Sequence, residues 1–280
     1  MKTIGFIDYY LSEWHANNYP QWINDANEKL GTDYQVAYAW AEEDVSPIDG
    51  VTTDEWCRNM GVSACKTIEE LCEKSDVILI LAPSNPEKHL QYAQEALKFG
   101  KRTYIDKTFS TDYETAKKIF DIAEENNTSF FSTSALRYAD ELKEFANANN
   151  IIITGGGSNF PEYLVHTVEM AVVLLASPAK KVKVECMGDQ RICRVIAENM
   201  TQAAIVYSPA YGFGISAEAS NGRYVNRGIS SNFFANLITS ILNFYEDGNL
   251  PFDTEQTLEV MHLRDGLLRA ENNDGNWIEL

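Results

Sequence analysis

One stretch of the sequence, EYLVHTVEM at residues 162–170, combines a histidine with two carboxylates. Glu162, His166 and Glu169 stand at i, i+4 and i+7, so in a helix they share one face. A carboxylate beside an imidazole orients the ring and raises its basicity, which suits a general base near neutral pH. A lone helical histidine can also be a hydrogen-bonded structural residue. Glu162 and His166 could supply two metal ligands, but no third ligand stands at a recognised spacing, so we expect no metal.

A second candidate is Lys107, which directly follows the strand-like run RTYID. Ligands of open α/β sheets bind outside the carboxyl ends of the strands, and a lysine at that position should project into this region. Taken alone, the residue could equally be an ordinary surface lysine.

The stretch IGFIDYYLSEWH at residues 4–15 stands where a dinucleotide-binding protein carries glycines. In the glycine fingerprint, the turn allows the backbone to approach the pyrophosphate, and the helix N-terminus supplies N–H donors. Here Asp8, Tyr9 and Tyr10 occupy the turn. Either dinucleotide binding is lost or reshaped, with a tyrosine stacked on a ring, or the turn has moved slightly and Ser12 caps a helix that still faces a phosphate. Both interpretations stay open.

Acidic residues follow the next strand-like run, in AWAEED at residues 39–44. Glu42 is the carboxylate that we expect to hold ribose hydroxyls if a cofactor binds, and acids here favour NAD over NADP because they repel a 2′-phosphate. The alternative is a solvated acidic loop.

These residues need a scaffold, and the first half of the chain alternates β-branched runs with helical patterns of ten or more residues. That alternation predicts βαβ units and a doubly wound parallel sheet. Gly100 and the Asn126-Asn127 pair stand where helices should end. After residue 150, strand-like segments follow one another without helices, which predicts an antiparallel sheet, with WIEL as a possible edge strand. We predict domains at 1–135 and 136–280.

Composition limits the classes of partner. The net charge of −18, from 41 acidic and 23 basic residues, argues against nucleic acid. The five cysteines form no C-x-x-C pair and no signal peptide is apparent, so we expect a reducing cytoplasm. The longest apolar runs are far shorter than the roughly 20 residues that span a bilayer, so we expect no membrane partner.

Residues 75–127 resemble the Gfo/Idh/MocA oxidoreductases. The resemblance rests on a strand ending in Ala82-Pro83, on His89, on AQEALKFGK, and on Asp106-Lys107-Thr108 in place of the family's E-K-P. It extends to EYLVHTVEM, which is similar to the family's D-x-x-x-H-x-x-D helix, and to the helical stretches from residue 235 onward. The family's proline is replaced by Thr108, which puts its tight local turn in doubt.

The resemblance implies a Rossmann domain followed by an α/β domain built on an open, mostly antiparallel sheet. It implies reversible hydride transfer between NAD(P) and a hydroxyl carbon of a sugar, cyclitol or similar small molecule. Lys107 would hold the substrate hydroxyl and assist proton movement, and His166 would be the base. The remaining residues that we assign by resemblance are Asp106 and Pro83 near the cofactor, and His89, Arg137, Tyr138 and Glu169 near the substrate.

We therefore expect a cytoplasmic oxidoreductase that binds NAD, with NADP less favoured, and a small-molecule substrate between its domains. By analogy with the family, we expect a homodimer or higher homo-oligomer through the C-terminal sheet. The alternative is a non-catalytic ligand-binding or assembly module that has kept the fold and binds no cofactor.

Overall fold

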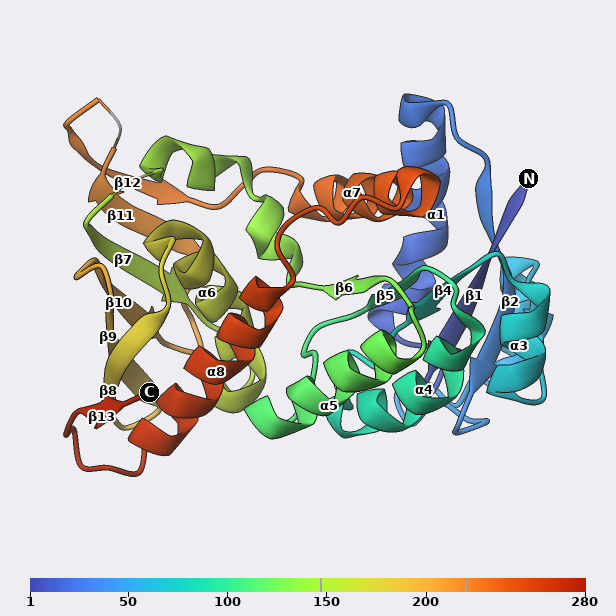
Figure 1. Cartoon of the computed structure of the whole chain (residues 1–280), viewed down its shortest axis with the longest axis horizontal. Helices are drawn as coiled ribbons and strands as arrows, with labels where there is room; N and C mark the ends of the chain where they lie inside the picture. Colours follow the sequence, from blue (N-terminus) through green and yellow to red (C-terminus); the bar gives the residue numbers. More distant parts are fainter. Residues whose placement is uncertain (147, 220) are drawn as a thin grey trace. The chain divides into compact units, whose positions relative to one another are not determined.

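The computed structural model of the chain describes residues 1–146, 148–219 and 221–280 (Figure 1). Contacts group these residues into two compact units. The first comprises Met1–Thr133 and Leu237–Thr254, and the second comprises Ser134–Asn236 and Glu255–Leu280. The division predicted from sequence texture did not include the return of residues 237–254 to the first unit.

The first unit is built on a parallel sheet of six strands in the order β3-β2-β1-β4-β5-β6. This is the strand order of a dinucleotide-binding Rossmann fold, so the predicted doubly wound sheet is confirmed. The strands are β1 (Lys2–Asp8), β2 (Tyr34–Ala41), β3 (Ser63–Ala64), β4 (Val77–Ile80), β5 (Thr103–Ile105) and β6 (Phe130–Ser132).

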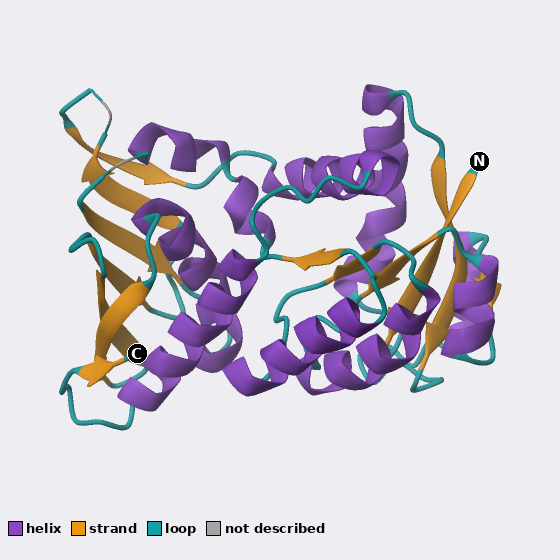
Figure 2. Ribbon diagram, in the orientation of Figure 1, coloured by secondary structure: helices purple, strands orange, loops and turns teal. Residues whose placement is uncertain are grey.

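Helices flank this sheet, with α1 on one face and α3, α4 and α5 on the other (Figures 1 and 2). Side chains start several of them: the hydroxyl of Thr52 accepts the amide of Glu55 in a capping box at α2, and Asp112 caps α5. The predicted helix ends at Gly100 and Asn126 are present. The helices are α1 (Trp14–Leu30), α2 (Thr53–Met60), α3 (Ile68–Lys74), α4 (His89–Ala96), α5 (Tyr113–Glu125) and α7 (Phe233–Asp247), of which α7 enters the first unit at Leu237.

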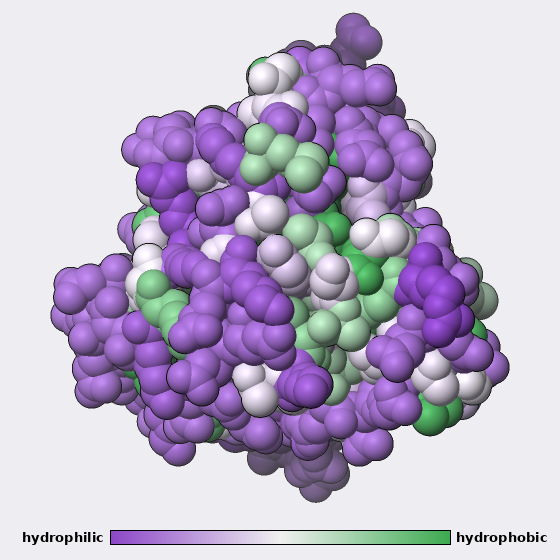
Figure 3. Space-filling model, turned by 90° about the vertical axis from the view of Figure 1, so that its right-hand side faces the viewer, coloured by the Kyte–Doolittle hydropathy of each residue, from purple (hydrophilic) through white to green (hydrophobic). Residues whose placement is uncertain are grey.

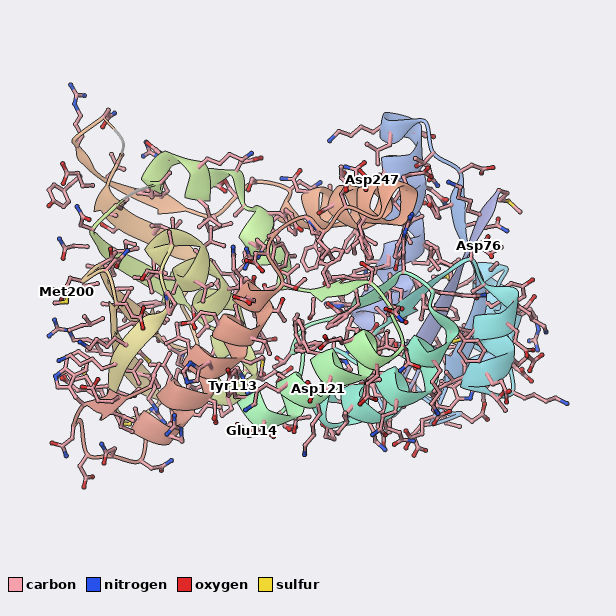
Figure 4. All side chains as sticks on the ribbon, viewed as in Figure 1. Asp76, Tyr113, Glu114, Asp121, Met200 and Asp247 are labelled. Atoms are coloured by element: carbon pink, nitrogen blue, oxygen red, sulfur yellow. The ribbon has the colours of Figure 1, made fainter. Side chains whose placement is uncertain are left out.

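Close contacts hold β1 and β4 in place at the centre of the sheet. A Cβ on Gly5 would lie only 2.4 Å from Leu71 Cδ2 in α3, so a larger residue would require the side chain of Leu71 to shift. Asp76, labelled in Figure 4, accepts the backbone N–H of Thr3 at 2.7 Å. Tyr245 in α7 donates its hydroxyl to the carbonyl of Ile78 at 2.6 Å. The amino-terminal halves of β1 and β4 are therefore firmly supported.

The second unit contains a seven-stranded sheet in the order β12-β11-β7-β10-β9-β8-β13. β7 and β10 pair in parallel and the other neighbours are antiparallel, which confirms the predicted mostly antiparallel sheet. The run WIEL supplies the edge strand β13, as predicted. The strands are β7 (Asn150–Gly155), β8 (Ala179–Met187), β9 (Gln190–Ala197), β10 (Gln202–Tyr207), β11 (Gly214–Glu218), β12 (Tyr224–Gly228) and β13 (Ile278–Glu279).

Helices α6 (Phe160–Leu175) and α8 (Glu255–Ala270) pack together on this sheet. Apolar side chains of α6 such as Leu164 and Val168 are fully or almost fully buried in the core of the second unit. None of the helices in the described residues is long and apolar enough to cross a membrane. The side of the molecule seen in Figure 3 is mostly hydrophilic, in keeping with the high content of acidic residues.

Candidate functional site

The turn between β1 and α1 carries no glycine at the positions where the fingerprint requires one. Asp8, Tyr10 and Glu13 stand at i, i+2 and i+5, which is the spacing of the three glycines in G-x-G-x-x-G. Two of the three positions therefore hold acids and the third holds an aromatic residue. The predicted turn residues are Asp8, Tyr9 and Tyr10, and the prediction does not include Glu13.

Glu13 is the N-cap of α1, and its side chain occupies the donors that a phosphate would use. Its carboxylate accepts the backbone N–H of His15 at 2.8 Å and also that of Ala16. The expectation that Ser12 caps the helix is wrong, because Ser12 instead donates its hydroxyl to Asp49 at 2.7 Å. The side chain of Glu13 is two atoms longer than that of a serine. From its position, one residue after Ser12, it reaches the amides of both His15 and Ala16.

Asp8 ends β1 with a side chain that is only 1% exposed. Its Oδ1 accepts the amides of Tyr9 at 2.7 Å and Ala82 at 3.0 Å. Burial, together with the nearby charge of Glu13, raises the pKa of Asp8 well above its ordinary value. Burial also raises the pKa of Glu13, although the charge of His15 opposes this.

A dinucleotide pyrophosphate does not fit this turn in the manner of the fingerprint. It would meet the carboxylates of Asp8 and Glu13, and the first free amides of α1 already have an intramolecular acceptor. Tyr10 adds a side chain at the position where the second glycine lets the backbone approach.

The predicted ribose-binding carboxylate has local partners in the same unit. Glu42 forms an ion pair with Lys88 and accepts the hydroxyl of Tyr92 at 2.8 Å. Hydrogen bonding to Lys88 lowers the pKa of Glu42, so it is ionised at neutral pH. Lys88 also lies 5.1 Å from the centre of the Tyr9 ring. Tyr9 thus packs under a lysine, an alternative to the predicted stacking on a cofactor ring.

Lys107 follows β5 at the carboxyl edge of the parallel sheet, as predicted, and the Lys107–Thr108 peptide bond is cis. Its Nζ lies 3.3 Å from the carbonyl oxygen of Pro83, another predicted site residue. Asp106 is 1% exposed and accepts the backbone N–H of Lys107 at 2.8 Å. The structure therefore brings Lys107, Asp106 and Pro83 together.

His15 also joins this group. Its Nδ1 pairs with Asp106, and its ring stacks on Tyr19 with centres 5.2 Å apart. Burial alone would raise the pKa of Asp106, but the charge and hydrogen bond of His15 outweigh it, and the pKa is lowered. The residues are 91 positions apart in the chain, so no spacing could have predicted the pair.

His89 is fully buried at the start of α4. Its Nδ1 lies 3.0 Å from the carbonyl of Phe109 and its Nε2 lies 2.5 Å from that of Leu81. Burial lowers the pKa of His89. Both ring nitrogens face backbone carbonyls, so the geometry is that of a structural histidine, and a role of His89 in substrate binding stays a prediction.

In the second unit, α6 carries the predicted histidine and acids. His166 Nδ1 lies 2.8 Å from the hydroxyl of Ser134. Glu169 accepts the backbone N–H of Ser134 at 3.1 Å and pairs with Arg137 at 2.5 Å. The carboxylate of Glu162 accepts a hydrogen bond from the side-chain amide of Asn159, the N-cap of the helix, at 2.8 Å.

Arg137 and Glu169 form a buried ion pair, with side chains 8% and 3% exposed. Arg137 also donates to Gln256 in α8 at 2.7 Å. The neighbouring Tyr138 ends the short helix 135–138 that carries Arg137. Ser134 had no sequence signal, because its position beside His166 depends on how this short helix meets α6.

No group of three or more His, Cys, Asp or Glu side chains in the described part of the chain could hold a metal ion. Lys107 belongs to the first unit, and His166, Glu169 and Arg137 belong to the second.

Comparison with known proteins finds a match to one protein family and to many solved structures. Residues 41–134 match the model of an oxidoreductase family described as having an NAD-binding Rossmann fold. No curated protein matches the chain significantly.

Solved structures match the whole chain at low sequence identity. A probable dehydrogenase from Thermotoga maritima has a TM-score of 0.79 at 13% identity, covering 99% of this chain and 98% of its own. The myo-inositol dehydrogenase from Lactobacillus casei, solved with NAD(H) and myo-inositol, has a TM-score of 0.79 at 12% identity, covering 100% and 96%. A scyllo-inositol dehydrogenase from the same organism, with NAD(H) and scyllo-inositol, has a TM-score of 0.74 at 14% identity, covering 99% and 98%. At these identities, the structures establish the fold alone.

Proposed function

Residues 41–134 match the Gfo/Idh/MocA oxidoreductase family, and from this premise we propose that the chain is an NAD-dependent oxidoreductase. It would act on a hydroxyl carbon of a sugar, cyclitol or similar small molecule. The observation that carries the proposal is Lys107, which lies within the matched residues and stands two residues after β5, at the carboxyl edge of a Rossmann sheet.

The residues around Lys107 have the chemistry that a hydroxyl substrate requires. The Lys107 ammonium can donate a hydrogen bond to the substrate oxygen and stabilise negative charge when the hydroxyl proton leaves. Asp106, a buried carboxylate bonded to both the Lys107 amide and His15, holds this group in place. We therefore assign Lys107 as the catalytic residue, with Asp106 and His15 as positioning residues. The base role of His166 stays a prediction.

The turn after β1 places a condition on the proposal. Asp8 and Glu13 leave no suitable place there for a pyrophosphate, so a dinucleotide would take its phosphate donors outside this turn. Glu43 and Asp44, exposed after β2, support NAD over NADP because their charges repel a 2′-phosphate. The cytoplasm also stays a prediction for the compartment.

A second function is favoured by the three residues at the glycine positions. Asp8, Tyr10 and Glu13 are what a ligand-binding protein would carry if it had kept the fold and lost the dinucleotide. The buried helix cap made by Glu13 supports this candidate, because it stabilises α1 without any bound phosphate.

Titration with NADH and NADPH, followed by nicotinamide fluorescence and thermal shift, separates the two candidates. The first predicts saturable NADH binding to the unmodified protein, tighter than NADPH binding. The second candidate predicts that the unmodified protein binds neither nucleotide. It also predicts that a variant combining Asp8→Gly, Tyr10→Gly and Glu13→Gly gains nucleotide binding, because these substitutions restore the fingerprint. Failure of both proteins to bind either nucleotide, with folding verified by circular dichroism, would refute the oxidoreductase proposal.

Lys107→Met tests the assignment of the catalytic residue once a substrate is found among polyols. The variant should keep its affinity for NADH and lose about 10²- to 10⁴-fold in turnover, the usual contribution of a positioned acid or base. The matched control is Lys117→Met, an exposed lysine in α5 that pairs with Glu114. Unchanged turnover in Lys107→Met would remove Lys107 from the chemistry.

A further inference from the structure

A small pocket lies at the turn after β1, where the ends of β1 and β4 meet the start of α1. Its volume is about 120 Å³. This is room for several water molecules, and so for a small organic molecule. The pocket is lined by Asp8, Tyr10, Glu13, Trp14, Ile48, Pro83, Ser84 and Asn85.

Asp8 brings an unused hydrogen-bond acceptor to this pocket. Its side chain is 1% exposed, and its Oδ1 is occupied by the amides of Tyr9 and Ala82. Its Oδ2 is buried and has no hydrogen-bond partner within the described residues. A buried polar atom without a partner is destabilising, and a ligand that donates a hydrogen bond to it would relieve this cost.

The charges around the pocket determine which ligand charge it favours. Asp8 and Glu13 are acids, and the lining contains no lysine, arginine or histidine. A phosphate would therefore be repelled, whereas a cation would be attracted.

The same lining favours an organic cation over a metal ion. A metal site normally needs three or more protein ligands, and the described residues contain no such group. The rings of Tyr10 and Trp14 line the pocket, and aromatic rings attract organic cations.

We propose that this pocket binds the primary ammonium group of a small organic molecule, which donates a hydrogen bond to Oδ2 of Asp8. The site replaces the phosphate site of the glycine fingerprint with one of opposite charge. The inference goes beyond the proposed function and holds for either candidate, because it depends only on the first unit. Burial and the nearby charge of Glu13 raise the pKa of Asp8, and a bound ammonium group would favour the ionised carboxylate that accepts the hydrogen bond.

Ethanolamine and ethylene glycol are suitable probes, because each has four non-hydrogen atoms and they differ in one ammonium group. The amides of Tyr9 and Ala82, both bonded to Asp8, report on the site in a ¹⁵N NMR titration. We expect ethanolamine to shift both resonances saturably and ethylene glycol to leave them unchanged. Equal shifts with the two probes, or no shift with ethanolamine, would overturn the proposal without any variant. Shifts with inorganic phosphate alone would show an anion site and would also overturn it.

Asp8→Asn should weaken ethanolamine binding at least tenfold. The control is Asp76→Asn, which alters another carboxylate on the same sheet that accepts a backbone amide but lies outside the pocket, and it should bind ethanolamine normally. Retention of full affinity in Asp8→Asn would contradict the proposal. The titrations contain no nucleotide, so failure of NADH binding and failure of this inference remain separate results.

Discussion

Glu259 in α8 is a carboxylate whose surroundings change its acidity. It accepts the backbone N–H of Ala179 at 2.7 Å, and His262 Nδ1 lies 3.9 Å away. Burial, opposed by the Ala179 amide and assisted by the charge of Glu198, raises its pKa from 4.5 to about 7. The folded protein therefore holds a proton on Glu259 at pH values where the unfolded chain has lost it.

This shift predicts a pH-dependent loss of stability. The pKa of Glu259 is higher in the folded protein than in the unfolded chain. Its contribution to the free energy of unfolding is therefore fully present below pH 4.5 and is lost as the pH rises through about 7. Above that window, Glu259→Gln should be more stable than the unmodified protein by about 1–3 kcal/mol, and near pH 4 the two should agree. Urea unfolding across this range measures the difference. Glu124→Gln, an exposed glutamate in α5, is the control, and a pH-independent difference for Glu259→Gln would contradict the assignment.

At the scale of elements, the residues that start two helices position the candidate site residues. Glu13 starts α1 and thereby places His15 beside Asp106, while Asn159 starts α6 and sets the position of His166. Asn159 accepts the amide of Glu162 at 2.9 Å. Because the first turn of a helix has free amides, a single side chain at its start can fix the whole helix.

Asn159→Ala should destabilise the start of α6 by about 0.5–2 kcal/mol, the usual cost of losing an N-cap. Faster hydrogen exchange at the amides of Glu162 and Tyr163 would report the loss. Asn159→Ser keeps a capping oxygen and should exchange almost as slowly as the unmodified protein. Equal protection in all three proteins would mean that packing in the core, not the cap, holds this turn.

At the scale of the whole molecule, the sheet of the second unit has a face that its helices do not cover. Ile152 in β7 is 47% exposed and Tyr224 in β12 is 73% exposed, whereas Ile151 and Ile153 point into the core. The open face contains a hollow of about 260 Å³ lined by Ile152, Arg194, Ala204, Ser216 and Tyr224 among others. Exposed apolar residues on a sheet support the proposal that copies of the chain associate through it.

Self-association should depend on this face and on salt. The net charge of −18 makes copies repel one another, so added salt should strengthen association by screening. Ile152→Lys should shift sedimentation velocity toward the monomer, while Met200→Lys, at another exposed apolar residue, should not (Figure 4). A monomer at every protein and salt concentration would refute the oligomer.

Local patterns in the sequence were enough to predict the alternation of strands and helices, the parallel and antiparallel sheets, the edge strand at WIEL and the place of Lys107 after β5. These features depend on side-chain periodicity and on residues close together in the chain. The cap made by Glu13, the pairing of His15 with Asp106, the partnering of His166 with Ser134 and the burial of Asp8 were not predictable in this way. The two pairings depend on residues from different elements. The cap of Glu13 is local, but its effect, like that of Asp8, depends on how deeply the fold buries it, because desolvation and contact distance, not residue type, determine what a charged side chain does.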